Sequence, residues 1–130
     1  MNAAEQTVRD YLGAMEARDL PAAQRMLAPG FSMEFPGAVR MSSLAQLLEW
    51  AKPRYRFARK IYERYDTCVS GEATVVYCFG TLSGEWLDGT PFAAIRFIDR
   101  FTLRAGLLAD QTVWNDMGEF RAAGGDTPTP

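Results

Sequence analysis

The chain of 130 residues contains no histidine. Without an imidazole, the sequence excludes Ser-His-Asp and Cys-His catalysis, histidine-ligated metals and imidazole proton transfer. Its two cysteines, Cys68 and Cys78, are too few for a disulfide scaffold or a structural zinc site. No GxGxxG, GxxxxGK(S/T) or CxxC motif is present. Any chemistry must come from carboxylates, tyrosines, a thiol or arginines, and we expect neither a cofactor nor a metal.

Long apolar runs and an excess of charge are also lacking. No run approaches the roughly 18 residues of a membrane span, and the N-terminus carries no basic-then-apolar signal segment. We therefore expect a cytoplasmic protein without a membrane partner. With 14 basic and 16 acidic residues, the chain has no overall field to attract nucleic acid. The hydrophobic fraction of 48% is typical of one ordinary globular domain.

Hydrophobic spacing predicts a helix over residues 3–18. Four apolar residues recur at the helical period and form one stripe: Val8, Tyr11, Leu12 and Met15. Asp19 is expected to cap a short second helix, which the Ala28-Pro29-Gly30 segment ends. A capping box at residues 43–46 opens a third helix, and Pro53 forces it to finish near Ala51.

Strands are predicted at residues 31–35 and throughout the second half of the chain. The expected ranges there are 56–69, 73–87, 92–103 and 107–117, with a hairpin at Asp88-Gly89. Helices followed by an antiparallel meander indicate an α+β domain over residues 1–121, with the N-terminal helices packed on a strongly curved antiparallel sheet and a pocket between them. Residues 122–130 have linker composition and are expected to form a flexible C-terminal tail.

Asp99 is the most informative residue of the predicted strand over 92–103. By alternation it shares one face with apolar side chains only: Ala93, Ile95, Phe97, Phe101 and Leu103. An isolated carboxylate there is costly, so Asp99 must be hydrogen-bonded, ion-paired or protonated. A structural aspartate, or a bulge that turns it outward, explains the pattern as well as a pocket acid does. Tyr11 lies on the helix that must cover this face, either as a core tyrosine or as a partner of Asp99.

The order of these elements resembles the nuclear transport factor 2-like superfamily, which includes ketosteroid isomerases, limonene epoxide hydrolases and SnoaL-type polyketide cyclases. The resemblance covers about residues 3–121 and is carried by residues 11–19, 99–106 and 113–116. It implies a cone-shaped, cystatin-like α+β barrel. Because the superfamily contains both catalysts and non-catalytic binders, the resemblance implies a fold more firmly than a function.

The resemblance to ketosteroid isomerase assigns catalytic roles to Tyr11 and Asp99. Their positions resemble the two oxyanion-hole donors of that enzyme, a phenol and a protonated carboxyl. The position of the isomerase's carboxylate base resembles Phe35 here, so the base is missing. The acid residues of the epoxide hydrolases are missing as well, because residues 77–81 hold neither Arg nor Asp and Val113 stands at the last aspartate position.

The resemblance also implies a pocket lined by apolar side chains and by one face of the last strand. The expected ligand-binding residues are Met33, Phe35, Trp86, Phe97, Phe101, Gln111, Val113 and Asn115. Gln111 and Asn115 could orient the oxygen of an apolar carbonyl compound, although half-buried amides are as often structural. The opposite face, with Trp114 and Asp116, is expected to form a homodimer contact.

Two further features have simpler explanations. Six basic residues alternate with aromatic side chains: Lys52, Arg54, Arg56, Arg59, Lys60 and Arg64. They superficially resemble a nucleic-acid-binding stripe, but the acidic character of the whole chain favours a solvated strand face. Cys78 has no adjacent base to activate it, so we expect an inert buried thiol.

Three functions remain open. The protein is a cofactor-independent isomerase or polyketide cyclase that transfers protons through Tyr11 and Asp99, a non-catalytic binder of an apolar carbonyl compound, or a dimerisation and adaptor module of the same fold. The missing base favours the binder over an isomerase of the usual type.

Overall fold

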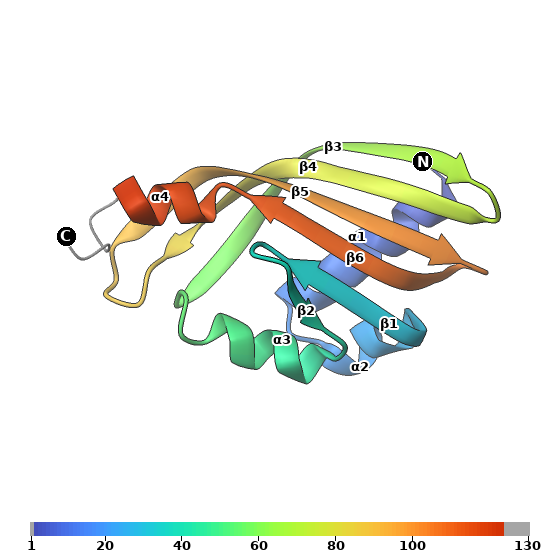
Figure 1. Ribbon diagram of the computed structural model, residues 1–130, viewed down its shortest axis with the longest axis horizontal. Helices are drawn as coiled ribbons and strands as arrows, with labels where there is room; N and C mark the ends of the chain where they lie inside the picture. The colour runs from blue at the N-terminus through green and yellow to red at the C-terminus, as the bar shows by residue number, and fades with distance from the viewer. Residues whose placement is uncertain (1, 124–130) are drawn as a thin grey trace.

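A computed structural model describes residues 2–123, in which four helices accompany a six-stranded sheet (Figure 1). The elements, in chain order, are α1 (Ala3–Glu16), α2 (Leu20–Arg25), β1 (Leu27–Phe35), β2 (Val39–Met41), α3 (Leu44–Ala51), β3 (Phe57–Ser70), β4 (Ala73–Glu85), β5 (Pro91–Arg104), β6 (Leu107–Asn115) and α4 (Met117–Ala123). The predicted α+β class, with N-terminal helices on a curved sheet, is confirmed. No helix within these residues is long and apolar enough to cross a bilayer.

The sheet has the strand order β2-β1-β6-β5-β4-β3. Its pairings are antiparallel except that β1 and β6 run parallel, with Met33 opposite Gln111. The sheet is curved but not closed. Among the described residues, β2 and β3 are the strands at its two opposite edges. In Figure 1, α1 lies across one face of the long strands, which we call the inner face, and α3 leads into the start of β3.

Helix caps explain where the N-terminal helices begin. The Asp19 side chain accepts a hydrogen bond from Ala22 N at 3.2 Å, which confirms it as the cap of α2. At α3, Ser43 Oγ accepts from Gln46 N at 3.1 Å, as a capping box requires. The reciprocal bond of the Gln46 side chain comes from Ser42 N rather than Ser43 N, at 2.7 Å.

Three segments differ from the sequence prediction. The sequence predicts that the segment over residues 28–30 ends the second helix. That helix ends earlier, at Arg25, and the segment lies inside β1, where Gly30 adopts φ +79° and the strand bulges between Leu27 and Ser32. Residues 39–41 form the short edge strand β2, which is too brief to show a period.

The third difference is helix α4 at residues 117–123. The Asn115 side chain caps its start by accepting from Met117 N at 3.0 Å. The helix includes the first two residues of the predicted tail, and residues 124–130 of that tail lie outside the described residues.

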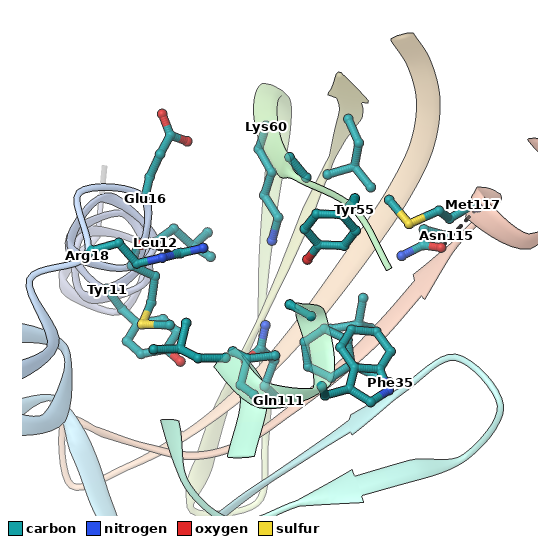
Figure 2. Close-up of a pocket in the computed structure, with 18 of the residues that line it drawn as sticks. Tyr11, Leu12, Glu16, Arg18, Phe35, Tyr55, Lys60, Gln111, Asn115 and Met117 are labelled. Carbon is teal, nitrogen blue, oxygen red and sulfur yellow. Dashed lines mark hydrogen bonds between the residues drawn. The ribbon is translucent and has the colours of Figure 1, made fainter. Parts of the chain in front are cut away.

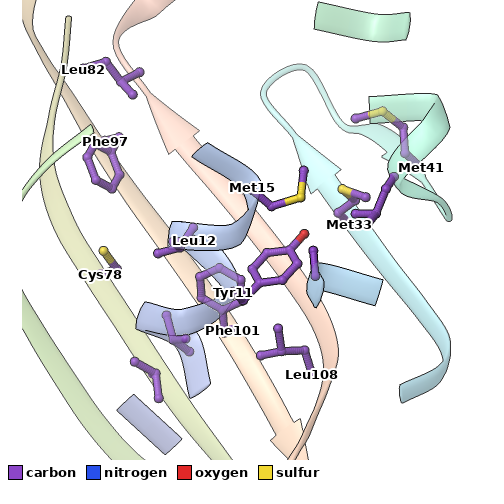
Figure 3. Close-up of a cluster of buried hydrophobic side chains, with 14 of the residues drawn as sticks. Tyr11, Leu12, Met15, Met33, Met41, Cys78, Leu82, Phe97, Phe101 and Leu108 are labelled. Carbon is purple, nitrogen blue, oxygen red and sulfur yellow. The ribbon is translucent and has the colours of Figure 1, made fainter. Parts of the chain in front are cut away.

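The core forms where α1 packs on the inner face of the sheet. The buried residues of α1 are the four of the predicted stripe: Val8, Tyr11, Leu12 and Met15. Figure 3 shows three of them, Tyr11, Leu12 and Met15, beside the side chains of β5 and β6. The Tyr11 ring meets the Phe101 ring edge-on, with centroids 5.9 Å apart. Tyr11 therefore does cover the face that carries Asp99, as its position in the sequence indicates.

Candidate ligand-binding site

A cavity of about 140 Å³ lies between α1, α3 and the inner face of the sheet (Figure 2). Its wall comprises Tyr11, Leu12, Met15, Glu16, Arg18, Phe35, Leu47, Leu48, Trp50, Ala51, Tyr55, Ala58, Lys60, Tyr62, Leu82, Gln111, Val113, Asn115 and Met117. Most of this wall is apolar or aromatic, and a cavity of roughly 150 Å³ is enough to hold a benzene ring. The cavity reaches solvent beside Glu16 and Arg18, which are exposed.

Strand alternation brings the β-sheet part of this wall together. On β6, Gln111, Val113 and Asn115 all line the cavity, while Trp114 is 50% exposed on the opposite face. The same period on β3 turns residues 58, 60 and 62 inward. Side chains far apart in the chain thereby share one wall.

Within residues 2–123, three polar atoms on cavity-lining residues are buried without a hydrogen-bond partner. They are Tyr11 Oη, Trp50 Nε1 and Gln111 Oε1. Tyr11 and Gln111 are only 1% and 4% exposed. Buried polar groups are nearly always hydrogen-bonded. The cavity wall therefore has two donors and one acceptor available for hydrogen bonds to a polar group inside the cavity.

Asp99 is fully buried and forms an ion pair with Lys60, whose Nζ donates to its Oδ2. Of the three states that the sequence allows for this carboxyl, the structure therefore has the ion-paired one. Lys60 itself lines the cavity, keeps 24% of its side chain exposed and lies 4.9 Å from the centre of the Phe97 ring. Asp99 is not part of the wall, so it acts on the cavity through Lys60. Within residues 2–123, no cluster of three or more Cys, Asp or Glu side chains could hold a metal ion.

The tyrosines around the cavity are held in their protonated form. Burial, and to a smaller extent the charge of Asp99, raises the pKa of Tyr11 well above its ordinary range. Tyr11 is consequently a hydrogen-bond donor at neutral pH. Burial also raises the pKa of Cys78, to about 12, so this thiol is protonated and inert, as expected.

Tyr55 and Tyr62 lie in different electrostatic surroundings. Burial raises the pKa of Tyr55, and the positive charges of Lys60, Arg18 and Arg54 oppose that rise. Burial also raises the pKa of Tyr62, where Tyr65, Cys78, Glu16 and Asp99 add to the rise. The surroundings of Tyr55 are therefore positive, whereas Tyr65 and Cys78, the first neighbours that act on Tyr62, are uncharged at neutral pH.

Five of the site residues expected from the sequence line the cavity: Tyr11, Phe35, Gln111, Val113 and Asn115. They come from α1, β1 and β6, and only the tertiary structure joins them. Phe35 packs on Trp50 with ring centroids 4.8 Å apart. Asn115 has a structural task as well, because its side-chain oxygen caps α4.

Five of the expected residues do not line this cavity, and their part in ligand binding stays a prediction. They are Met33, Trp86, Phe97, Phe101 and Asp99. Phe97 and Phe101 lie one layer deeper, since they pack against wall residues Tyr62 and Tyr11 respectively. Met33 is buried in the core, and Trp86 is buried at the β4–β5 hairpin against Phe92, with centroids 4.4 Å apart.

The sequence prediction missed Lys60, because it placed this residue on a solvated strand face. That description fits Arg59 and Arg64, which lie over the Phe57 and Phe79 rings. The signal that could have separated them is the period of two on β3, since Ala58, Lys60 and Tyr62 share a face. The sequence prediction also missed the wall residues that α3 contributes, which include Leu47 and Trp50.

A scan against protein-family models finds no match, and a search of the curated proteins finds no relative. Solved structures do match. A nuclear transport factor 2-like protein of unknown function from Burkholderia pseudomallei K96243 superposes with a TM-score of 0.78 at 20% identity, over 94% of this chain and 97% of that one. TerC, co-crystallised with polyporic acid, gives 0.77 at 16% identity over 93% and 97%.

A third match is a protein from Jannaschia sp. CCS1 that is described as a SnoaL-like polyketide cyclase. Its TM-score is 0.72 at 18% identity, over 97% of this chain and 94% of that one. At such low identities the likeness concerns the fold and not the chemistry. The chain has the fold of the nuclear transport factor 2-like proteins.

Proposed function

We propose that this protein binds a small, planar and largely apolar compound through a carbonyl or hydroxyl oxygen. One observation carries the proposal: Tyr11 Oη and Gln111 Oε1 are buried in one cavity wall, and neither has a hydrogen-bond partner in the part of the chain that the structure describes. A carbonyl oxygen satisfies the Tyr11 donor, and a hydroxyl satisfies the Gln111 acceptor as well. Aromatic residues on the remaining wall, such as Phe35 and Trp50, suit a flat ring.

The solved structures of similar fold support this proposal. TerC was co-crystallised with a small organic acid, polyporic acid, and other similar structures are described as a polyketide cyclase and a ketosteroid isomerase. Each of these descriptions concerns a protein that acts on, or was crystallised with, an organic molecule. They favour a ligand pocket over an adaptor module whose cavity has no use.

The simplest test is a titration with acetophenone, a neutral aryl ketone, followed by amide chemical shifts. We expect saturable shifts on α1, α3 and β6. Val113→Phe fills the cavity and should abolish them, whereas Thr112→Phe, on the neighbouring residue that faces the other side of β6, should leave them unchanged. Equal binding by both variants would contradict a ligand in this cavity.

Proton-transfer isomerisation or cyclisation is the catalytic form of the same proposal. Tyr11 would donate to the developing enolate oxygen, and Asp99 would contribute through the Lys60 ammonium that it holds. The wall offers no carboxylate at Phe35, where the isomerase base is expected. In Phe35→Asp, we expect faster conversion of 3-cyclohexen-1-one into its conjugated isomer, a gain that Tyr11→Phe should remove. No gain would leave the protein a binder, since a base must lie within about 3 Å of its proton.

We also propose that the outer face of the sheet forms a homodimer. Across β6, β5 and β4, Trp114 pairs with Ile98, which in turn pairs with Phe79. Half of the Trp114 surface and 58% of Ile61 are exposed on this sheet. An apolar row between polar neighbours suits an isologous contact.

A further inference from the structure

One end of the cavity gathers positive charge. In Figure 2, the polar ends of Lys60, Arg18 and Tyr55 point into the same part of the site. The charges of both Lys60 and Arg18 act on the Tyr55 hydroxyl, which supports their closeness. Arg18 follows α1, Tyr55 follows α3 and Lys60 lies on β3, so three separate segments of the chain converge here.

The cations at this end retain capacity for a ligand. The Lys60 ammonium has three N–H groups, and one of them is donated to Asp99. Arg18 donates one bond, from Nη1 to the Met15 carbonyl oxygen at 2.7 Å, and forms no ion pair with any carboxylate of residues 2–123. Several charged N–H donors therefore remain for an acceptor in the cavity.

The backbone at Arg18 adds an independent observation. Its φ is +59°, in the left-handed region that favours glycine after a helix. An arginine there accepts a conformation that most side chains avoid. In Figure 2, its guanidinium turns from the end of α1 into the site.

The acidic groups near the cavity do not cancel this field. Asp99 lies behind Lys60, which separates it from this end of the cavity wall. Glu16 also lines the cavity, but in Figure 2 its carboxylate points away from Arg18 and Lys60. Arg54, whose guanidinium lies 4.1 Å above the Trp50 ring, adds positive charge near Tyr55.

We propose that the cavity binds its ligand as an oxyanion, a phenolate, enolate or carboxylate on a planar ring, with the negative oxygen against Lys60 and Arg18. This inference rests on the proposed function and names its ligand class. Charge-assisted hydrogen bonds from an ammonium and a guanidinium are the strong ones, and they strengthen when the ring excludes water. Asp99 is then a positioning residue, because it holds the Lys60 ammonium at the wall.

The test compares 4-nitrophenol with 4-nitroanisole, which has nearly the same shape but cannot ionise. Calorimetry gives both affinities, and visible absorbance reports how much of the bound nitrophenol is phenolate. We expect the phenolate to bind roughly tenfold or more tightly than the ether, as one charged hydrogen bond implies. The bound nitrophenol should also ionise at a lower pH than it does in water.

Variants assign the effect to the cations. Lys60→Met combined with Asp99→Asn removes both charges together, so that no buried carboxylate is left unpaired. This double variant should lose most of the phenolate preference, because only Arg18 of the two cations remains. Arg18→Gln, an exposed change, should reduce the phenolate preference, and the outer-face pair Arg64→Met with Asp66→Asn is the matched control that should retain it.

The outcomes separate the two proposals. A phenolate preference that falls in the Lys60/Asp99 double variant supports the oxyanion site. If the wild-type protein binds the ether as tightly as the phenolate, or if the double variant keeps the full preference, the oxyanion site is wrong and the pocket remains a binder of neutral compounds. If neither probe binds, both proposals fail.

Discussion

Lys60 on β3 and Asp99 on β5 form an ion pair across the strand between them, although 39 residues separate them in the chain. On β4, Lys60 is opposite Leu82 and Asp99 is opposite Cys78, so the lysine side chain extends along the sheet past Gly80. The pair neutralises a buried carboxylate and keeps an ammonium at the cavity wall. It thereby links the stability of the sheet to the chemistry of the site.

Removal of only one member of this pair should destabilise the fold. Lys60→Met leaves the fully buried Asp99 carboxylate without a counter-charge, and we expect a loss of about 3 kcal/mol in the free energy of unfolding. The double variant with Asp99→Asn should recover most of that loss. Urea denaturation of the three proteins provides the measurement. Equal stability of the single and double variants would show that the pair is not formed in solution.

Tyr11→Phe should separate binding from stability. The hydroxyl has no partner in the structure, so its removal should leave the urea midpoint unchanged or slightly higher. Binding of acetophenone should weaken by roughly 1 kcal/mol, because its carbonyl oxygen loses the Tyr11 donor. Tyr65→Phe is the matched control, since Tyr65 lies outside the cavity wall. A large loss of stability without a change in affinity would mean that Tyr11 is only a core residue.

Alkaline pH should unfold the protein. Burial raises the pKa of Tyr11, Tyr62 and Tyr65 above the ordinary 10.0, and that of Cys78 from 9.0 to about 12. These groups ionise more readily in the unfolded chain, so the stability they contribute is complete below about pH 9 and falls as the pH rises further. Urea midpoints should stay level between pH 8 and about 9 and should decrease from there to about pH 11. A flat profile would contradict burial of these groups.

Gly80 should tolerate no side chain. A Cβ atom there would lie 2.0 Å from the Ile61 carbonyl oxygen and 2.9 Å from the Phe97 ring. Gly80→Ala should therefore cost about 1–3 kcal/mol or abolish folding. Gly13→Ala is the control, because a Cβ added at Gly13 would have no atom within 4 Å. In a helix, alanine is more favourable than glycine by about 1 kcal/mol. Thermal unfolding should show a lower Tm for Gly80→Ala and a higher Tm for Gly13→Ala than for the wild-type protein.

The proposed homodimer predicts that Trp114→Glu yields monomers. A charge in the centre of an apolar interface is costly to bury, whereas Leu87→Glu, at the exposed β4–β5 turn, should leave the assembly intact. Sedimentation velocity distinguishes the species. Wild-type protein that sediments as a monomer at high micromolar concentration would rule the dimer out.

The sequence alone determined the elements that depend on local chemistry. The apolar stripe of α1, the caps at Asp19 and Ser43 and the four long strands follow from periodicity and from side chains that bond to their own backbone. The absence of histidine narrowed the chemistry to phenols and charged side chains. Alternation also placed Gln111, Val113 and Asn115 on one face, and all three line the cavity.

Only the tertiary structure decided which of these side chains meet. Alternation assigns Phe97, Phe101 and Lys60 to one face of the sheet. It does not show whether that face meets a cavity or a packed helix at each position. That depends on where α1 and α3 cover the curved sheet, which brings Trp50 and Tyr55 opposite β3 and buries Phe101 beneath Tyr11. The partner of Asp99 was hidden for the same reason. Periodicity describes one strand at a time, whereas the ion pair with Lys60 depends on strand register across β4 and on the reach of a long side chain.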